Sequence, residues 1–381
     1  MQRRRVRTSA ASDLWQQVFA RLAANPAAAV MDPLHDGHAD RDRRHEALRA
    51  AGWSEAWIAG SDAAQAERIA VAPETSPGIN PGVEAQYSIL ADSIEAAMAR
   101  LNYHSQERVA RGVEPRVGPY AAKTNVIMTD ESIVTVGAFL FRYCGLVARA
   151  FSRTLKLNPW LWEPGDYDEE RARKLIAGDP QLLLYWVRIY TSFAISGTHA
   201  FVPYRPSTLD EVMLMEQVSR AMEIFAIAHE YGHHHLDHGR ELEADPRAEE
   251  FAADAFALRI SDEVEKEPVV MENPYLLSGA GGLILLSSLD TLRAVEKALG
   301  ARHPDPGTHP SVTERIARFE AIRLLLPDDH CWLKGFRTAS RRVMMIVHKM
   351  LMEGFASMPD EMLETFRRQR GEFEQWKDLK G

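Results

Sequence analysis

The chain has 381 residues, of which 46% are hydrophobic and 26% are charged, and its formal net charge at pH 7 is −9. This composition is ordinary for a globular protein and excludes disordered, collagen-like and coiled-coil rod classes. The acidic balance argues against a nucleic-acid partner, which needs clustered lysine and arginine. Only two cysteines occur, so disulfide frameworks and thiolate metal sites are excluded, and a reducing compartment is indicated.

The first part of the chain predicts polar helices. Residues 1–7 hold four arginines, but the apolar core of roughly 7–15 residues that a secretory signal requires does not follow. Alanine-rich helical patterns cover residues 14–24 and 46–58. The breaker-rich segment 73–81 predicts a linker, and helical patterning resumes over residues 88–101.

The next segment contains short β-rich runs. Residues 126–129 and 132–136, separated by two acidic residues, predict a hairpin over residues 125–137. The apolar stretch 133–151 is interrupted by two arginines, whereas a membrane span needs about 20 mostly apolar and uncharged residues. This stretch therefore predicts a buried helix. Residues 198–204 predict a further strand.

The expected fold class is α+β and mostly helical, with a small β-hairpin or sheet and helical N- and C-terminal additions. We divide the chain into four regions. Residues 1–72 are a helical N-terminal region, and residues 84–205 are a helical region with the hairpin, which is a candidate lid or recognition lobe. Residues 206–326 are a core that carries the motif described next, and residues 327–381 are a helical C-terminal region. Because no signal or spanning segment is recognised, we expect a soluble, cytoplasmic protein without a membrane span.

One predicted helix carries a metal-binding motif. A capping-box pattern at residues 208–211 predicts its start, and it runs into an H-E-x-x-H sequence at residues 229–233. The i, i+4 spacing places His229 and His233 on one face, one turn apart, where both imidazoles can bind one Zn²⁺. Glu230 is rotated by about 100° from His229. It therefore suits a general base that takes a proton from the zinc-activated water, rather than a third ligand.

Three more histidines follow at the end of the same helix. His234, His235 and His238 stand just before Gly239, and we interpret them as a helix C-terminus whose dipole favours imidazole side chains. His234 and His238 are also four residues apart. However, His235 stands where the motif requires glutamate, so this pair is the weaker metal-binding candidate.

A catalytic zinc site needs a third protein ligand and an open fourth position. A metzincin would have histidine at position 239, where this chain has glycine, so that class is excluded. Downstream, Glu250 and Asp254 are spaced i, i+4 on a predicted helix after Pro246. Glu250 completes a His₂Glu set, and Asp254, one turn on, can accept a hydrogen bond from a ligand imidazole.

Two alternatives for the third ligand stay open. Glu249 is adjacent to Glu250, and Glu241 begins a similar E-x-x-A-D spelling. The segment of Glu241 is the weaker candidate, because Gly239 and Pro246 bracket it and make it too short for a metal-facing helix. It also leaves little chain to return to the metal.

Together these residues resemble the gluzincin metallopeptidases, in particular the family of the CAAX prenyl proteases and the heat-shock membrane zinc peptidases. Three blocks carry the likeness, at residues 228–233, 250–254 and 308–319. The resemblance implies a zincin-like core with one Zn²⁺ per chain. It also makes His309 and Arg315, both in the third block, candidates for contacts with the substrate or the transition state.

The chain also departs from this family. Members of the family are mostly membrane-embedded or exported, whereas this chain shows neither feature, and its gap from His233 to Glu250 is short. The short gap also resembles cytosolic gluzincins that cleave phage repressors and soluble phage-exclusion peptidases. The hairpin over residues 125–137 echoes a hairpin of the family. This likeness implies that one of its strands is a sheet edge along which a peptide substrate adds.

The favoured function is a soluble zinc metallopeptidase that acts on a protein or peptide substrate, with Glu230 as general base. The reaction's oxyanion needs a further donor, for which His309, Arg315 and Tyr231 are candidates. One alternative is a non-catalytic, zinc-stabilised regulatory or binding protein, in which a residue such as His238 closes the fourth coordination position. A second alternative is a phage-defence or toxin-like peptidase with one host protein target, which differs only in substrate range.

Overall fold

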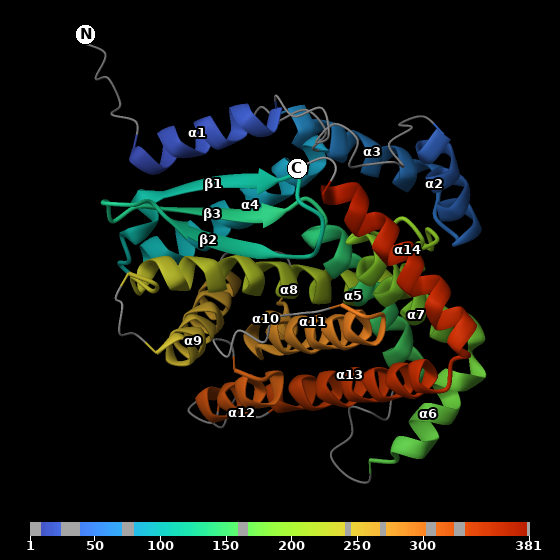
Figure 1. Cartoon of the computed structure of the whole chain (residues 1–381). Helices are drawn as coiled ribbons and strands as arrows, with labels where there is room; N and C mark the ends of the chain where they lie inside the picture. Colours follow the sequence, from blue (N-terminus) through green and yellow to red (C-terminus); the bar gives the residue numbers. More distant parts are fainter. Residues whose placement is uncertain are drawn as a thin grey trace.

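The computed structural model describes residues 9–23, 39–70, 80–158, 167–240, 245–266, 272–301, 310–323 and 332–378. In these ranges, helices surround one small sheet (Figure 1), which confirms the predicted α+β, mostly helical class. The helices before the sheet are α1 (Ala10–Ala23), α2 (Ala39–Ala50), α3 (Glu55–Ala70) and α4 (Pro81–Arg100). Those between the sheet and the motif helix are α5 (Leu140–Leu157), α6 (Glu169–Gly178) and α7 (Pro180–Ser196). The motif helix and those after it are α8 (Leu209–His235), α9 (Pro246–Glu265), α10 (Pro274–Leu277), α11 (Ala280–Ala298), α12 (Val312–Arg323), α13 (Leu333–Ala356) and α14 (Asp360–Asp378).

The sheet has three strands in the order β1-β3-β2. After the short 3-10 helix η2 (Ser105–Arg108) come β1 (Val109–Glu114), β2 (Ala121–Asn125) and β3 (Ser132–Gly137). β1 pairs parallel with β3, with Val109 opposite Ser132, and β2 pairs antiparallel with β3, with Ala121 opposite Val136. All of β3 is buried, whereas β2 lies at an edge of the sheet and is only partly buried.

The predicted hairpin is present, but its first strand is displaced. The predicted strand 126–129 forms the connecting turn, which is closed where the Val126 N–H donates to the Glu131 carbonyl at 3.0 Å. In this turn Ile127 and Met128 are 87% and 98% exposed, and Met128 has a φ of +64°. These side chains favour a strand, but there is no sheet face for them to pack on. The more polar β2 becomes the strand instead because it pairs with the buried β3.

The stretch 133–151 is not one buried helix, which corrects a second prediction. Its first residues belong to β3, and α5 begins only at Leu140. The run before Gly137 is rich in β-branched residues, which fit a pleated sheet better than a helix. The stretch is nevertheless mostly buried, as expected.

The predicted strand over residues 198–204 is wrong. Helix α7 ends at Gly197, which adopts a left-handed φ of +68°. Ser192 Oγ donates to the Thr198 carbonyl at 2.8 Å and accepts from the Phe201 N–H at 3.0 Å. Because a side chain of α7 satisfies these backbone groups, the segment forms a turn rather than pairing with a strand.

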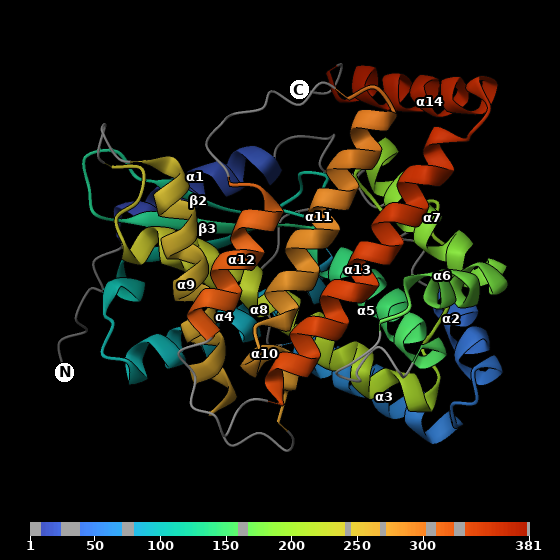
Figure 2. The same ribbon diagram turned by 90° about the horizontal axis from the view of Figure 1, so that it is seen from below.

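Helix α8 lies at the centre of the described structure. It packs against the sheet and contacts α4, α5, α9 and α11 (Figure 1). The predicted capping box is confirmed, since the Glu211 carboxylate accepts from the Thr208 N–H at 3.1 Å. Helices α9, α12, α11 and α13 lie side by side in Figure 2. One hydrophobic cluster extends from Tyr87 on α4 to Phe355 on α13 and includes α8, so the motif helix is anchored in the main core.

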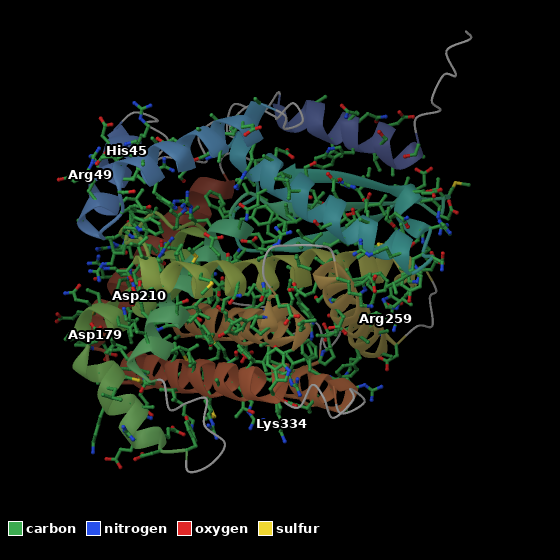
Figure 3. The ribbon with its side chains drawn as sticks, turned by 180° about the vertical axis from the view of Figure 1, so that it is seen from behind. His45, Arg49, Asp179, Asp210, Arg259 and Lys334 are labelled. Atoms are coloured by element: carbon green, nitrogen blue, oxygen red, sulfur yellow. The ribbon has the colours of Figure 1, made fainter. Side chains whose placement is uncertain are left out.

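The first three helices lie outside this core. Trp15 of α1 packs in a small separate cluster with β1 and β3. Polar contacts join α2 to α3. His45 of α2, which is labelled in Figure 3, has its Nε2 2.7 Å from a carboxylate oxygen of Asp62 on α3. Trp53, between them, donates its indole N–H to the Ser207 carbonyl at 2.9 Å and so connects this pair to the start of α8.

Within the described ranges, no helix combines the length and the apolar character that a membrane crossing requires. Most of the predicted linker 73–81 lies outside the described residues. The division of the chain into four regions stays a prediction.

Candidate metal centre

Helices α8 and α9 bring the three candidate ligands together. His229 and His233 lie one turn apart on α8, and Glu250 lies near the start of α9. The two helices approach closely at Gly232, where a Cβ atom would stand 3.1 Å from Ala253 Cα, closer than packed side chains normally come. The glycine inside the motif therefore lets α9 carry Glu250 up to the histidines.

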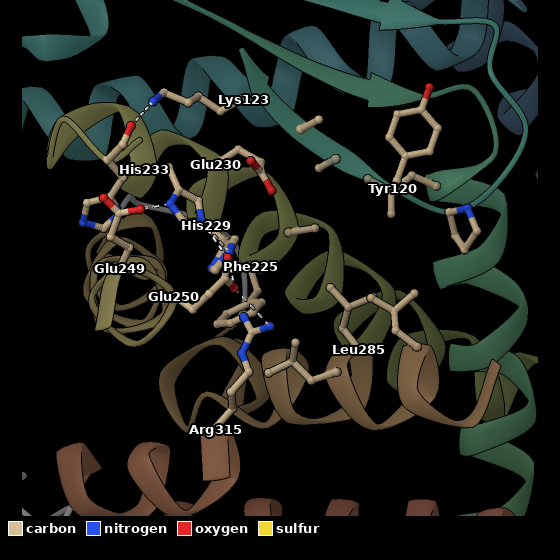
Figure 4. Close-up of a pocket in the computed structure, with 18 of the residues that line it drawn as sticks. Tyr120, Lys123, Phe225, His229, Glu230, His233, Glu249, Glu250, Leu285 and Arg315 are labelled. Atoms are coloured by element: carbon tan, nitrogen blue, oxygen red, sulfur yellow. Dashed lines mark hydrogen bonds and ion pairs between the residues drawn. The ribbon is translucent and has the colours of Figure 1, made fainter. Parts of the chain in front are cut away.

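The ligand groups of these three residues form a triangle of short contacts. His229 Nε2 lies 3.1 Å from His233 Nε2 (Figure 4). Of the two Glu250 oxygens, Oε2 lies 3.5 Å from His229 Nε2 and Oε1 lies 3.4 Å from His233 Nε2. Two ligand atoms bound at about 2.0–2.1 Å to a tetrahedral ion lie roughly 3.3 Å apart. The group could therefore hold a metal ion, and two imidazoles with one carboxylate are a donor set that suits zinc.

The charges around the triangle keep its carboxylate ionised. Burial acts to raise the pKa of Glu250, but His229, His233 and Arg315 outweigh this effect and hold the pKa well below its usual range. Burial acts to lower the pKa of His229, but Asp254 and Glu250 together raise it to about 9. A proton and a metal ion therefore compete for the same imidazole.

Asp254 and Arg315 support the ligands from behind. Asp254 is fully buried, and its Oδ1 lies 3.1 Å from His229 Nδ1, although the contact lacks the alignment of a directed hydrogen bond. Arg315 Nε donates to Asp254 Oδ2 at 2.7 Å, and its Nη2 donates to Oδ1. Arg315 Nη1 also lies 3.5 Å from Glu250 Oε2. Arg315 also borders the cavity described below, and its guanidinium contacts both carboxylates. Its expected contact with a substrate stays a prediction.

His238 supports the second histidine. Its Nδ1 lies 2.9 Å from His233 Nδ1, and burial together with the neighbouring His233 lowers the pKa of His238 to about 4, so that its ring is neutral. When Nε2 of His233 faces a metal, its Nδ1–H can donate to this neutral ring. Lys123 Nζ and Asn125 Nδ2 donate to the His238 carbonyl at 2.6 Å and 3.3 Å. Strand β2 therefore holds the turn that places His238.

A cavity of about 570 Å³ opens beside the triangle. Residues of β2, α8, α9 and α11 line it, and Glu230 is among them. Figure 4 shows Glu230 between the ligand residues and β2, with Lys123 and Tyr120 on the strand side and Leu285 of α11 on the opposite side. The general base expected from the motif therefore has access to the space in front of the ligands.

His234 and His235 anchor the end of α8. His234 Nδ1 lies 2.9 Å from Ser132 Oγ on β3, and its Nε2 lies 2.8 Å from the Ser105 carbonyl. His235 Nδ1 lies 2.9 Å from Ser105 Oγ. These contacts fasten the helix end to β3 and η2, so the two histidines are structural, as the helix-end interpretation expects. His238 has the different place described above.

The other candidates from the sequence have different outcomes. Glu249 accepts from a backbone N–H at 2.9 Å and is not part of the triangle. Tyr231 is buried, donates to Glu95 Oε1 at 2.6 Å and is not among the residues that line the cavity at the ligands. His309 and the alternative ligand Glu241 lie outside the described residues.

Sequence reasoning did not find the residues of β2 and α11 that complete the cavity. They include Lys123, Asn125, Leu285 and Arg293. Burial, with a smaller effect from Arg240, lowers the pKa of Lys123 to about 8. No local pattern marks these residues, because their place depends on how β2 and α11 pack against α8.

Comparisons of this chain with models of protein families, with curated proteins and with solved structures give no match. The site is therefore defined by the residues of this chain: two histidines of α8 and a glutamate of α9, placed so that they could hold one metal ion.

Proposed function

We propose that this chain is a zinc-dependent metallopeptidase whose site is similar to that of the gluzincins. The observation that carries the proposal is the triangle of His229, His233 and Glu250 beside a cavity that Glu230 lines. Three protein ligands with an adjacent carboxylate base form the arrangement that hydrolytic zinc sites use. The ligand separations of 3.1–3.5 Å support an ion of the size and geometry of zinc.

The residues of the chain supply positioning and proton transfer. A zinc ion bound here would act as a Lewis acid and lower the pKa of a water molecule toward about 7. Glu230 takes a proton from the attacking water and delivers it to the leaving amine. Asp254 and Arg315 hold two of the ligands in place during both steps. His309 stays a candidate for contact with the substrate.

A peptide substrate fits along β2. This strand is at an edge of the sheet, and Ala121, Ala122 and Lys123 line the cavity. Edge strands present backbone groups to which an extended peptide can add as a further strand. A peptide that lies on β2 would pass Glu230 and the ligand triangle within the same cavity, which supports peptide hydrolysis over other zinc chemistry.

A purely structural zinc site is the competing function. Such a site closes its fourth position with another protein ligand. Among the described residues, His238 is bonded to the outer nitrogen of His233 rather than placed in the triangle. A structural site also has no use for Glu230 in the cavity. Both observations favour hydrolysis.

The test compares hydrolysis of a broad peptide library by the wild type and by Glu230→Gln at equal zinc content. Glutamine keeps the size of the side chain but cannot accept the proton. We expect cleavage to fall by about 10²–10⁴-fold while zinc binding is unchanged. Glu361→Gln, an exposed change on α14, is the control for the loss of one charge. Equal cleavage by the wild type and Glu230→Gln, or no cleavage by the wild type, would overturn the proposal.

A further inference from the structure

A second and larger cavity lies on the N-terminal half of α8. Its volume is about 880 Å³, and residues of α3, α4, α5 and α8 line it. It shares no lining residue with the cavity at the metal ligands. A volume of several hundred Å³ is typical of sites for small organic ligands. This second cavity is therefore a separate site that metal chemistry does not explain.

The charge of the second cavity is opposite to that of the whole chain. Four arginines line it: Arg68, Arg142, Arg149 and Arg220. The acidic residues in its lining are Glu216 and Glu223. Glu223 is 4% exposed and accepts hydrogen bonds from Ser219 Oγ at 2.8 Å and Gln86 Nε2 at 2.9 Å. Burial raises the pKa of Glu223 to about 8, so this group is mostly neutral at pH 7 and the excess of positive charge is larger than the residue count suggests.

Two of these arginines lack a carboxylate partner. In the part of the chain that the structure describes, neither Arg149 nor Arg220 has a carboxylate within the 4.0 Å of an ion pair. Among the described residues, Arg149 makes one hydrogen bond, from its Nη1 to the Tyr185 hydroxyl at 3.5 Å, and its buried Nε has no hydrogen-bond partner. Its Cζ also lies 6.0 Å from the centroid of the Tyr204 ring. The buried Nδ1 of His199, which also lines this cavity, has no hydrogen-bond partner in the described ranges either. Buried polar atoms without partners are costly unless something binds them.

The remaining wall of the second cavity is apolar. Trp57 of α3 and Ile89 of α4 line it, and each is 42% exposed. Phe139, Phe141 and Leu146 add further apolar surface. Ligand pockets commonly combine an apolar wall with a few polar groups that fix one end of the ligand.

We propose that this cavity binds a small organic anion. Its carboxylate or phosphate head is held by Arg149 and Arg220, and its apolar body lies against Trp57 and Ile89. Arginine is suited to both heads because its planar guanidinium can donate two parallel hydrogen bonds to either. The site is independent of the proposed peptidase activity, since its lining is separate from that of the metal centre.

The experiment is calorimetric titration of the full chain with three probes: octanoate, phenyl phosphate and inorganic phosphate. We expect octanoate or phenyl phosphate to bind, and inorganic phosphate, which has no apolar body, to bind at least tenfold more weakly than the better of the two. Binding of octanoate alone would assign a carboxylate head, and binding of phenyl phosphate alone would assign a phosphate head. Failure of both organic anions to bind would overturn the proposal.

Variants test whether the probe binds in the second cavity. Arg220→Gln is expected to weaken binding of the better probe by at least tenfold, and Arg220→Lys, which keeps the charge, to weaken it less. Arg259→Gln is the matched control, because Arg259 is exposed on α9 and lines neither cavity (Figure 3). Wild-type affinity in Arg220→Gln, or an equal loss in Arg259→Gln, would contradict the proposal. Because no step uses peptide hydrolysis, the result is independent of the proposed function.

Discussion

Arg315 holds both carboxylate oxygens of Asp254, with its Nε 2.7 Å from Oδ2 and its Nη2 bonded to Oδ1. Asp254 in turn lies 3.1 Å from His229, so a side chain of α12 is connected through α9 to a candidate ligand on α8. Asp254 is fully buried and Arg315 is only 8% exposed. The pair is therefore shielded from solvent, and each partner depends on the other for its charge to be balanced.

Arg315→Met should destabilise the fold and weaken metal binding. The change leaves the buried carboxylate of Asp254 without its cation, which typically costs about 3–5 kcal/mol of unfolding free energy. Loss of support for a ligand residue typically weakens metal affinity by about 10–100-fold. Chemical unfolding and zinc titration measure the two effects. Arg318→Met, on the exposed face of the same helix, is the control and should change neither.

His238→Ala should weaken zinc binding without unfolding the protein. It removes the ring that lies 2.9 Å from the outer nitrogen of His233, and such supporting contacts are worth about 10–100-fold in affinity. Competition with a chelator measures the affinity. His235→Ala removes a nearby imidazole that binds Ser105 instead, so it should leave the affinity unchanged. Equal affinities in the two variants would show that His238 has no part in the site.

The motif itself could be predicted because its geometry is local. Spacing of i, i+4 fixes His229 and His233 on one helix face whatever surrounds the helix, and the same argument places Glu250 beside Asp254. The support around these residues is not local. His238 is held by Lys123 and by its neighbours on β2, a strand whose polar sequence gave no strand signal.

The strands of the sheet also could not all be predicted from the local sequence. Strand β1 was not predicted, because it carries the charged Arg111 in its middle. That side chain is stabilised by Glu95 and Asp92 of α4, at 2.8 Å and 2.6 Å. In the turn after β2, the apolar Ile127 and Met128 suggested a strand although nothing covers them. In both places the partner across the fold, rather than the local sequence, decides the structure.

Glu223→Gln should change how stability depends on pH. Burial raises the pKa of Glu223 from 4.5 to about 8, so the folded state binds this proton more tightly than the unfolded state. The stabilisation from the protonated group is complete below about pH 4.5 and is lost as the pH rises through about 8. The wild type should therefore lose more unfolding free energy between about pH 5 and pH 8 than Glu223→Gln. Denaturant titrations at several pH values test this, and parallel profiles would contradict it.

Gly281→Ala should destabilise the contact between α11 and α8. A Cβ at this position would clash with the side chain and backbone of Ala221 on α8. Overpacking of this kind typically costs about 1–3 kcal/mol. Gly354→Ala, on α13, has no atom within 4 Å of the added Cβ and should be neutral or stabilising by about 0.5–1 kcal/mol. Thermal unfolding of both variants tests the close approach, and equal stabilities would contradict it.

The metal centre is tested most directly by the zinc content of two neighbouring variants, Glu250→Gln and Glu249→Gln, after dialysis against a weak chelator. Both changes remove one carboxylate from α9, but only Glu250 belongs to the ligand triangle. We predict one zinc per chain in the wild type and in Glu249→Gln, and much less than one in Glu250→Gln. Full zinc content in Glu250→Gln, or loss of zinc only in Glu249→Gln, would contradict the site.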